Sequence, residues 1–290
     1  MSTTFSGASS DTLELLLDFC AAHPVPDIDA QRFLTRLNSG PDAIIDWRDR
    51  GVVAVLLDAV KGASEAIPLE IVGLVPHALN VEVARELLDE VAERTKKLGC
   101  PATELALSEI WAPHAGLAIE RGYCRAYADL DMVCHDPNWG DAAKLPTGWS
   151  WHDVQPVWVD EYIRVLGAAF AGIAGTFLPS PAEIRRYLAD PAIQARALVA
   201  DGRALAVLRM TPARRYIHAI ARDPAWRGAG LGRLAMDEAR SCLLATAPWQ
   251  GSLELTVVDT NAAAMELYRR CGFIVNREMT VLNRTLHPAG

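Results

Sequence analysis

The 290-residue sequence lacks the cysteine patterns of metal-binding and disulfide-rich proteins. Its six cysteines stand singly, and no two of them form a Cys-x-x-Cys pair. Clustered cysteines are what structural zinc sites use, and evenly paired ones are what small secreted scaffolds use. We therefore expect no bound metal and a reduced, cytoplasmic environment.

The sequence also lacks a membrane-spanning run and an excess of basic charge. The apolar run at 13–20 is short and contains acidic residues, and no basic segment precedes it. A signal peptide and a membrane span are therefore not expected. The net charge of -8 argues against nucleic acid as the main partner. What remains is a globular protein, a monomer or homodimer, with room for one large domain or two smaller ones.

An internal repeat favours two domains. Gly122 and Gly272 each end a short helical pattern, and they lie 150 residues apart. The alternating strand patterns around Leu105 and Leu255 keep the same offset. Repetition of this kind indicates two copies of one supersecondary arrangement. We expect a tail at 1–10, a first domain at 11–135, a linker at 136–148 and a second domain at 149–290.

Hydrophobic periodicity predicts the same order of elements in each half. In the first half, helices are expected at 11–22, 29–37, 80–98 and 114–121, and strands at 43–47, 52–60, 67–75, 103–107 and 125–134. In the second half, helices are expected at 158–169, 181–189, 231–245 and 262–270, and strands at 195–200, 204–210, 214–221, 252–258 and 273–286.

One glycine-rich stretch stands out, Trp226 to Gly232, directly before the helical pattern at 231–245. Glycines let backbone N–H groups approach a ligand, and a helix start offers unpaired donors. Such an arrangement binds anions, above all phosphates. The stretch lacks the third glycine of a dinucleotide fingerprint, because Arg233 stands there, and it lacks a Gly-Lys-Ser/Thr sequence. An ordinary turn before a helix remains the alternative.

The downstream sequence decides between these alternatives through a resemblance. Arg227-Gly228-Ala229-Gly230-Leu231-Gly232 resembles the pyrophosphate-binding motif of the Gcn5-related N-acetyltransferase (GNAT) family. The segment from Asn261 through Tyr268 to Gly272-Phe273 resembles a second signature of that family. Both occur in the family's order, and the resemblance covers residues 150–286. It implies an α/β (α+β) fold of two tandem acetyltransferase-like domains, each a mixed, mostly antiparallel central sheet flanked by helices.

The resemblance implies acetyl-CoA as cosubstrate, no metal, and an amine acceptor. The expected acetyl-CoA-binding residues are Ile220 and Arg222 (backbone N–H groups), Arg227, Gly228, Ala229, Gly230, Leu231, Gly232 and Asn261. The strands at 214–221 and 252–258 would splay to admit the pantetheine arm. Arg222 stands where the family usually has a small apolar residue, so it could reach a phosphate, reach an acidic acceptor or face solvent.

Two side chains are candidates for proton transfer. Tyr268 would protonate the departing thiolate, because a phenol keeps its proton at neutral pH. His218 would take the proton that the acceptor ammonium loses, since an unperturbed histidine titrates near pH ~6.5. Acids are common at the position of His218 in the family, so a structural histidine is the alternative there.

The first half lacks these features. At the offset of 150, the glycine stretch corresponds to 77–82, which has no glycine and carries Glu82. Tyr268 corresponds to Ala118 and Asn261 to Trp111. The first half therefore resembles an acetyltransferase domain without an active site. The resemblance as a whole implies an N-acetyltransferase that works by direct attack in a ternary complex. The alternatives are a non-catalytic acyl-CoA-binding or regulatory module, or an enzyme similar to mycothiol synthase.

Overall fold

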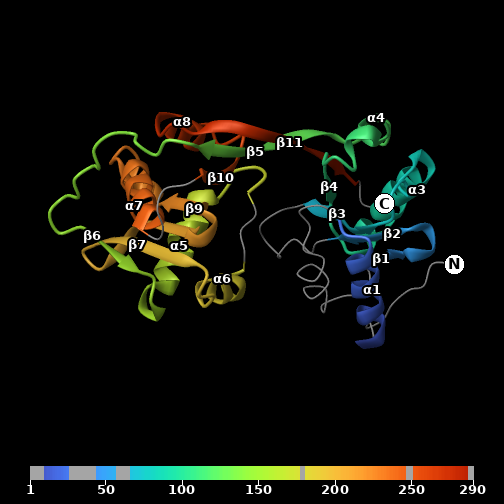
Figure 1. Ribbon diagram of the computed structural model, residues 1–290, viewed down its shortest axis with the longest axis horizontal. Coiled ribbons are helices and arrows are strands. Elements are labelled where there is room, and N and C mark those ends of the chain that lie inside the picture. Colours follow the sequence, from blue (N-terminus) through green and yellow to red (C-terminus); the bar gives the residue numbers. More distant parts are fainter. Residues whose placement is uncertain (1–9, 26–43, 57–65, 177–179, 246–250, 287–290) are drawn as a thin grey trace. The chain divides into compact units, whose positions relative to one another are not determined.

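A computed structural model describes residues 10–25, 44–56, 66–176, 180–245 and 251–286. It divides the chain into two compact units (Figure 1). The first consists of Met1–Ala126 together with Met279–Gly290, and the second of Tyr127–Glu278. The predicted helix at 29–37 and nearly all of the predicted tail lie outside the described residues.

The first unit holds a sheet in the order β1-β2-β3-β4-β11, in which β3 and β4 run parallel and the other pairs antiparallel. Its elements are α1 (Ser10–Ala22), β1 (Ile44–Trp47), η2 (Arg48–Arg50), β2 (Val52–Leu56), β3 (Ala66–Leu74), α3 (Val81–Lys97), β4 (Ala102–Ala106), η3 (Ala112–His114) and α4 (Ala115–Glu120). The last part of β11 completes this sheet by pairing with β4, for example Val281 with Ala106.

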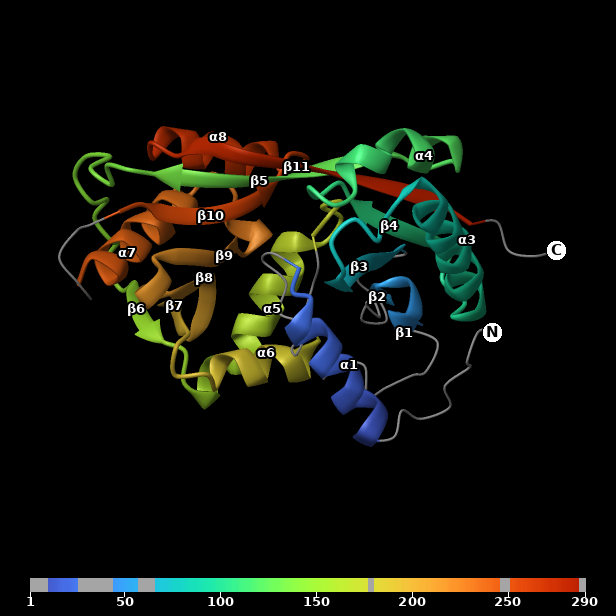
Figure 2. The ribbon, with the colours of Figure 1, turned by 45° about the vertical axis from the view of Figure 1, so that its right-hand side comes forward.

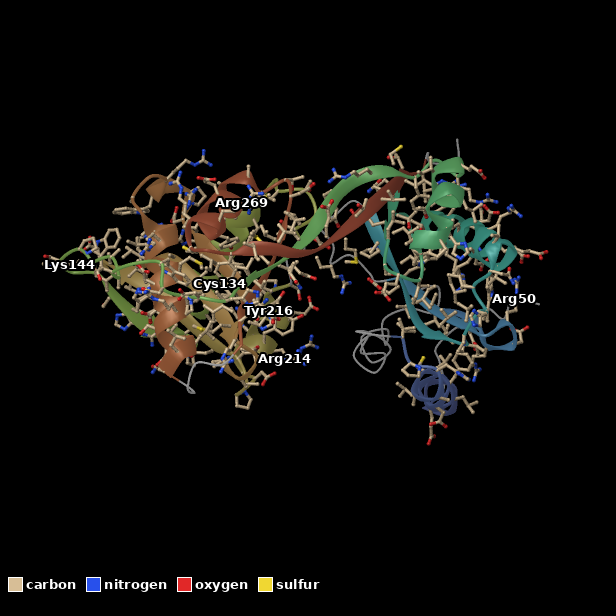
Figure 3. The ribbon with its side chains drawn as sticks, turned by 45° about the horizontal axis from the view of Figure 1, so that its top comes forward. Arg50, Cys134, Lys144, Arg214, Tyr216 and Arg269 are labelled. Atoms are coloured by element: carbon tan, nitrogen blue, oxygen red, sulfur yellow. The ribbon has the colours of Figure 1, made fainter. Side chains whose placement is uncertain are left out.

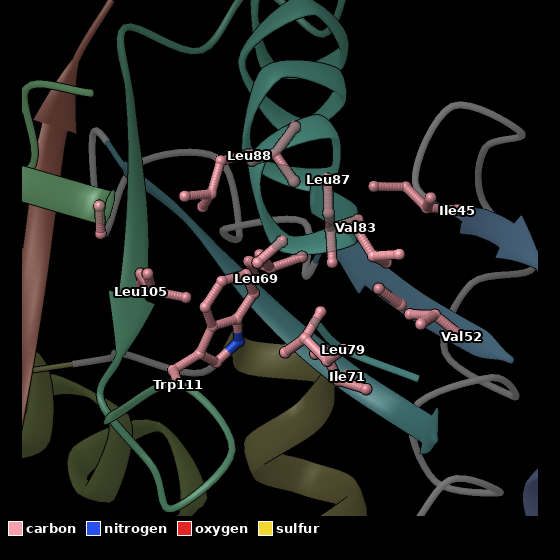
Figure 4. Close-up of a cluster of buried hydrophobic side chains, with 14 of the residues drawn as sticks. Ile45, Val52, Leu69, Ile71, Leu79, Val83, Leu87, Leu88, Leu105 and Trp111 are labelled. Carbon is pink, nitrogen blue, oxygen red and sulfur yellow. The ribbon is translucent and has the colours of Figure 1, made fainter. Parts of the chain in front are cut away.

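The main core of the first unit lies between this sheet and α3 (Figure 4). Apolar residues of α3 recur every three or four positions, so they share the face that meets the sheet. Val83, Leu87, Leu88 and Val91 of this face are buried. Trp111 packs into the same cluster beside Leu79.

The second unit holds strands in the order β5-β10-β9-β8-β7-β6, with β9 and β10 parallel (Figure 2). Its elements are β5 (Cys124–Cys134), β6 (Ser150–Asp153), η4 (Pro156–Trp158), α5 (Val159–Phe170), α6 (Pro181–Leu188), β7 (Gln194–Ala200), β8 (Arg203–Thr211), η5 (Pro212–Arg214), β9 (Tyr216–Arg222), η6 (Pro224–Trp226), α7 (Leu231–Ala245), β10 (Leu253–Val258), α8 (Ala262–Arg270) and β11 (Ile274–Thr285).

Helices cover both faces of this sheet. Met236 and Ala239 of α7 share a buried cluster with Leu255 of β10 and Tyr268 of α8. Tyr162 of α5 belongs to another cluster, together with residues of β7, β8 and β9. Alternate residues of a strand point to opposite faces, so β9 supplies side chains to both clusters.

The units repeat one arrangement. α3, β4 and β5 of the first sequence half correspond to α7, β10 and β11 of the second, at the predicted offset of 150 residues. The structure is therefore a pair of tandem α/β units, each with a mixed, mostly antiparallel sheet.

The units divide at residues other than those expected. The sequence predicts a boundary at 135, whereas the compact units divide after Ala126, within β5, whose residues Asp129–Cys134 pair with β10 of the second unit. The last strand was assigned wholly to the second domain, but residues from Met279 onward belong to the first unit. The segment 136–148, expected to be a linker, lies within the second unit, where Trp139 Nε1 donates to Asp237 Oδ1 at 2.8 Å.

Candidate active site

The glycine stretch connects β9 to α7 through the short η6 helix. Gly228 and Gly230 have φ angles of 85° and 74°, which residues with a side chain rarely adopt. Ala229 N–H donates to the carbonyl of Trp226 at 3.3 Å. Within the described residues, no acceptor takes the N–H groups of Gly228, Gly230, Leu231 or Gly232. The start of α7 therefore presents several backbone donors that a ligand could use.

The charge around this helix start suits an anion. The first turn of α7 has no acidic residue. Arg227 is exposed, and the structure records no side-chain hydrogen bond or ion pair for it among the described residues. The nearby carboxylate of Asp223 is held by Arg164 at 2.7 Å, which lowers the pKa of Asp223. A helix start with free donors, a nearby Arg and no first-turn acid attracts negative charge.

The start of α7 contacts α8 directly. A Cβ atom built on Gly232 would lie 2.8 Å from Cδ2 of Leu267, so the close approach of the two helices favours glycine there. Asn261 caps α8 by accepting a hydrogen bond from the N–H of Ala264 at 3.2 Å. The two predicted sequence signatures therefore lie next to each other in the second unit.

The two parallel strands pair over only a short length. Tyr216 pairs with Glu254 and Ile217 with Leu255, and the register records no further pair between these described strands. The following part of β9 contains Ile220 and Arg222. On its other side this part pairs with β8. The recorded ladder between β9 and β10 therefore ends before Ile220 and Arg222.

Tyr268 lies on α8, with its ring in the same cluster as Ile220. The side chain is only 8% exposed, and its ring centroid lies 6.0 Å from that of Phe273. Burial raises the pKa of Tyr268 above its usual value, since removal from water disfavours the phenolate. Within the described residues its hydroxyl has no recorded hydrogen-bond partner, so Tyr268 keeps a proton that it could donate.

His218 lies at an irregularity of β9. Ile217 pairs with Met210 and Ala219 with Arg209, so His218 is one extra residue relative to β8. A bulge of this kind re-aims the side chain. The ring is exposed, Nε2 lies 2.7 Å from the hydroxyl oxygen of Thr211, and the ring centroid is 4.8 Å from that of Tyr216. His218 is thus an exposed side chain, whereas Tyr268 lies in the buried cluster and Ile220 packs against it.

The first unit fills the equivalent positions with its own side chains. Asn80 caps α3, and its Oδ1 accepts from the N–H groups of Glu82 and Val83 at 3.0 Å. The cap of α3 therefore uses the N–H group of Glu82, whereas the N–H group of Gly232, at the equivalent position of α7, has no acceptor among the described residues. Trp111, at the position of Asn261, is only 3% exposed and packs into the core. Strands β3 and β4 pair over four residues, against two for β9 and β10.

The sequence did not reveal a group of polar side chains beside His218. Tyr216 Oη lies 2.7 Å from Thr256 Oγ1, and Thr256 Oγ1 donates to Asp131 Oδ1 at 2.6 Å. These residues come from β9, β10 and β5. The alternation of polar and apolar residues along β10 could have placed Thr256 on the face away from α7 and α8. The pairing with Asp131 depends on topology.

A loop after α5 also contacts this region of the second unit. Thr260 Oγ1 donates to the carbonyl of Ala174 at 3.0 Å. A Cβ atom on Gly175 would come within 2.6 Å of the ring of Tyr127. These contacts fix the loop to the turn before α8 and to β5.

No helix among the described residues has the length and apolar character that a bilayer crossing requires. No group of three or more His, Cys, Asp or Glu side chains in the described parts of the chain is placed to hold a metal ion.

Comparison with known proteins identifies the family. The acetyltransferase (GNAT) family profile matches residues 126–273, which nearly coincide with the second unit. No curated protein matches the chain in sequence. A tandem GNAT protein from the clavulanic acid biosynthesis pathway is 16% identical, with a TM-score of 0.66 over 98% of each chain. A Gcn5-related N-acetyltransferase from Sphaerobacter thermophilus is 15% identical, with a TM-score of 0.62, covering 95% of this chain and 92% of that one.

At these identities the solved structures show that the fold is shared over both units. The profile match covers slightly more than half of the sequence and includes both predicted signatures. The chain therefore belongs to the GNAT acetyltransferase family.

Proposed function

We propose that the protein transfers an acetyl group from acetyl-CoA to an amine, by direct attack in a ternary complex on the second unit. The observation that carries this proposal is the start of α7, where free backbone donors follow two glycines with positive φ. A pyrophosphate needs several donors that converge without intervening side chains, and this loop offers them. Arg227 adds a positive charge without a competing ion pair in the described structure.

The residues proposed to hold acetyl-CoA come from strand β9 and from the starts of the helices α7 and α8. They are Arg227, Gly228, Ala229, Gly230, Leu231 and Gly232 at the pyrophosphate, with the backbone N–H groups of Ile220 and Arg222, and Asn261, along the pantetheine arm and thioester. Hydrogen bonds from the unpaired part of β9 would stabilise the oxyanion that forms when the carbonyl is attacked.

His218 and Tyr268 are proposed to transfer the protons. His218 takes the proton that the acceptor ammonium loses, and the amine nitrogen then bonds to the acetyl carbon. The carbon–sulfur bond breaks, and coenzyme A leaves with the proton of Tyr268. Tyr268 regains a proton from the nitrogen of the tetrahedral intermediate. The raised pKa of Tyr268 suits a group that must be protonated at neutral pH.

A non-catalytic acyl-CoA-binding module is the second candidate, because binding alone would also use the start of α7. Tyr268 favours the enzyme, since a sensor has no need of a buried acid at this position. A thiol-release assay separates them. The protein is mixed with acetyl-CoA and, in turn, 1,4-diaminobutane, glucosamine and a peptide with a free N-terminus. Amine-dependent release supports the enzyme, whereas binding of acetyl-CoA without release on any amine supports the module.

A further inference from the structure

One face of β9, β10 and β5 carries a chain of polar side chains. Leu253, Leu255 and Val257 of β10 are buried in the cluster that contains α7 and α8, so Thr256 points to the opposite face. Thr256 pairs with Asp131 across the ladder, which brings these two side chains together. Tyr216 lies on β9 of the same unit (Figure 3).

Asp131 determines which group donates in each hydrogen bond of the series Tyr216–Thr256–Asp131. The carboxylate of Asp131 only accepts, so the hydroxyl of Thr256 donates its single proton to Asp131. Thr256 can then only accept from its other neighbour, and the hydroxyl of Tyr216 must be the donor. The phenolic oxygen of Tyr216 is left with lone pairs and no proton to offer. Toward any further group it can therefore act only as a hydrogen-bond acceptor.

Asp131 has only a long ion pair, and its surroundings keep Tyr216 neutral. The second carboxylate oxygen of Asp131 is 3.9 Å from Arg277 Nε, which is long for an ion pair between half-exposed side chains. Burial first of all, and then the nearby carboxylates of Asp131, Glu254 and Asp129, raise the pKa of Tyr216, while its hydrogen bond with Thr256 lowers it. The net result is a tyrosine that stays neutral and keeps its proton in the bond to Thr256.

We propose that Tyr216, held as a hydrogen-bond acceptor by Thr256 and Asp131, binds the ammonium group of the acceptor and positions it beside His218. The inference rests on the proposed acetyl transfer and names the group that the site recognises, a protonated primary amine. Such an amine has three N–H donors, so it can bond to Tyr216 and still present a proton to His218. The centroids of the two rings are 4.8 Å apart, so the rings are in contact and one small group could reach the polar edges of both.

The test uses Thr256→Val, which removes the link between Tyr216 and Asp131 while it keeps a β-branched side chain on the strand. Thr256→Ser keeps the hydroxyl and serves as the rescue variant. Glu254→Gln removes a carboxylate from the same face of β10 and leaves the hydrogen bonds among Tyr216, Thr256 and Asp131 in place. It therefore controls for general electrostatic attraction of the amine. KM and kcat are measured for acetyl-CoA and for whichever amine of the panel the full-length protein turns over fastest, and thermal melting checks that each variant is folded.

The expected result is a rise of about ten-fold in the KM for the amine in Thr256→Val, with the KM for acetyl-CoA unchanged within about two-fold, the scale of one lost hydrogen bond to a charged group. Thr256→Ser and Glu254→Gln should stay within about two-fold of the wild type. An unchanged amine KM in a folded Thr256→Val would overturn the inference and leave acetyl transfer standing. Absence of turnover by the wild type on every amine would overturn the proposed function first, before any variant is compared.

Discussion

Tyr268 and Ala118 occupy equivalent positions in the two repeats, and only Tyr268 has a proton to give. Its surroundings preserve that proton, because the buried ring raises the pKa of the hydroxyl. A free thiol titrates near ~8.5 and a free phenol near ~10. Tyr268 therefore stays protonated at neutral pH, where its hydroxyl can serve as a hydrogen-bond or proton donor.

Replacement of Tyr268 by Phe should lower kcat by roughly ten- to a thousand-fold, as expected for a lost general acid. The KM for acetyl-CoA should change little, because the start of α7 is untouched. Tyr187→Phe, which removes a hydroxyl from α6 of the same unit, is the control. The wild type should also show no loss of kcat from Tyr268 ionisation below pH ~10, since its pKa is raised. An unchanged kcat in Tyr268→Phe would remove this residue from the mechanism.

His218 is predicted to set the acidic limb of the pH–rate profile. A protonated histidine cannot accept a proton, so the rate should fall as the pH falls. His218→Ala should lower the rate at neutral pH by about a hundred-fold and flatten that limb. Rates are measured between pH 5 and 9 at saturating acetyl-CoA. A limb that keeps its position in the variant would show that the base is another group.

Glu70, on β3 of the first unit, should make stability depend on pH. Burial raises its pKa to about 7, and no charged partner in the described structure offsets this. A carboxyl group with a raised pKa binds its proton more tightly in the folded state. Its contribution to stability is therefore complete below the unfolded pKa of about 4.3 and is lost as the pH rises through about 7.

Glu70→Gln should accordingly stabilise the protein at pH 8, by on the order of 2 kcal/mol, and have little effect near pH 4.5. Urea unfolding of wild type and variant at the two pH values measures the difference. If the free energies of unfolding of the two proteins differ equally at both pH values, the titration of Glu70 does not contribute to the pH dependence of stability.

At the scale of elements, α3 and α7 start in opposite ways although they are repeats of one helix. Asn80 occupies the N-cap of α3, and its side chain accepts hydrogen bonds from two N–H groups. Gly230, at the equivalent position of α7, has no side chain that could accept them. The same helix start is thus closed by its own side chain in one unit and left open in the other.

Gly230→Asn tests this difference. A Cβ atom at Gly230 would meet nothing within 4 Å, and asparagine tolerates a φ of 74° better than most residues, so the fold should persist. The added side chain would compete for the donors, and we expect the KM for acetyl-CoA to rise by about ten-fold. The control is Asn80→Ala, which should cost about 1 kcal/mol of stability and leave that KM unchanged. Equal effects of the two substitutions on KM would contradict the assignment.

Local sequence patterns predicted most elements and the glycine loop, because helix periodicity, glycine placement and strand alternation are properties of neighbouring residues. The pairing of β11 with β4 of the first unit could not be predicted from local patterns, because the two strands are far apart in the sequence. The Tyr216–Thr256–Asp131 chain was missed for the same reason, as Thr256 and Asp131 are 125 residues apart. The bulge at His218 also depends on the register with β8.

At the scale of the whole molecule, the two units predict one acetyl-CoA site per chain. The first unit has a capped helix start, a buried Trp111 and a longer β3–β4 ladder where the second unit has free donors. Calorimetric titration of the full-length protein with acetyl-CoA should give a stoichiometry close to one. A stoichiometry of two, reduced to one by Gly230→Asn, would show that the first unit also binds the cosubstrate.

Initial-rate kinetics of the full-length protein test the central claim most directly. CoA release is measured while acetyl-CoA and the best amine are both varied, and mass spectrometry follows the acetylated amine. Direct transfer in a ternary complex predicts double-reciprocal lines that intersect, with one acetylated amine formed per CoA released. Parallel lines, which indicate a covalent acetyl-enzyme, or CoA release without acetylated amine, would contradict the account.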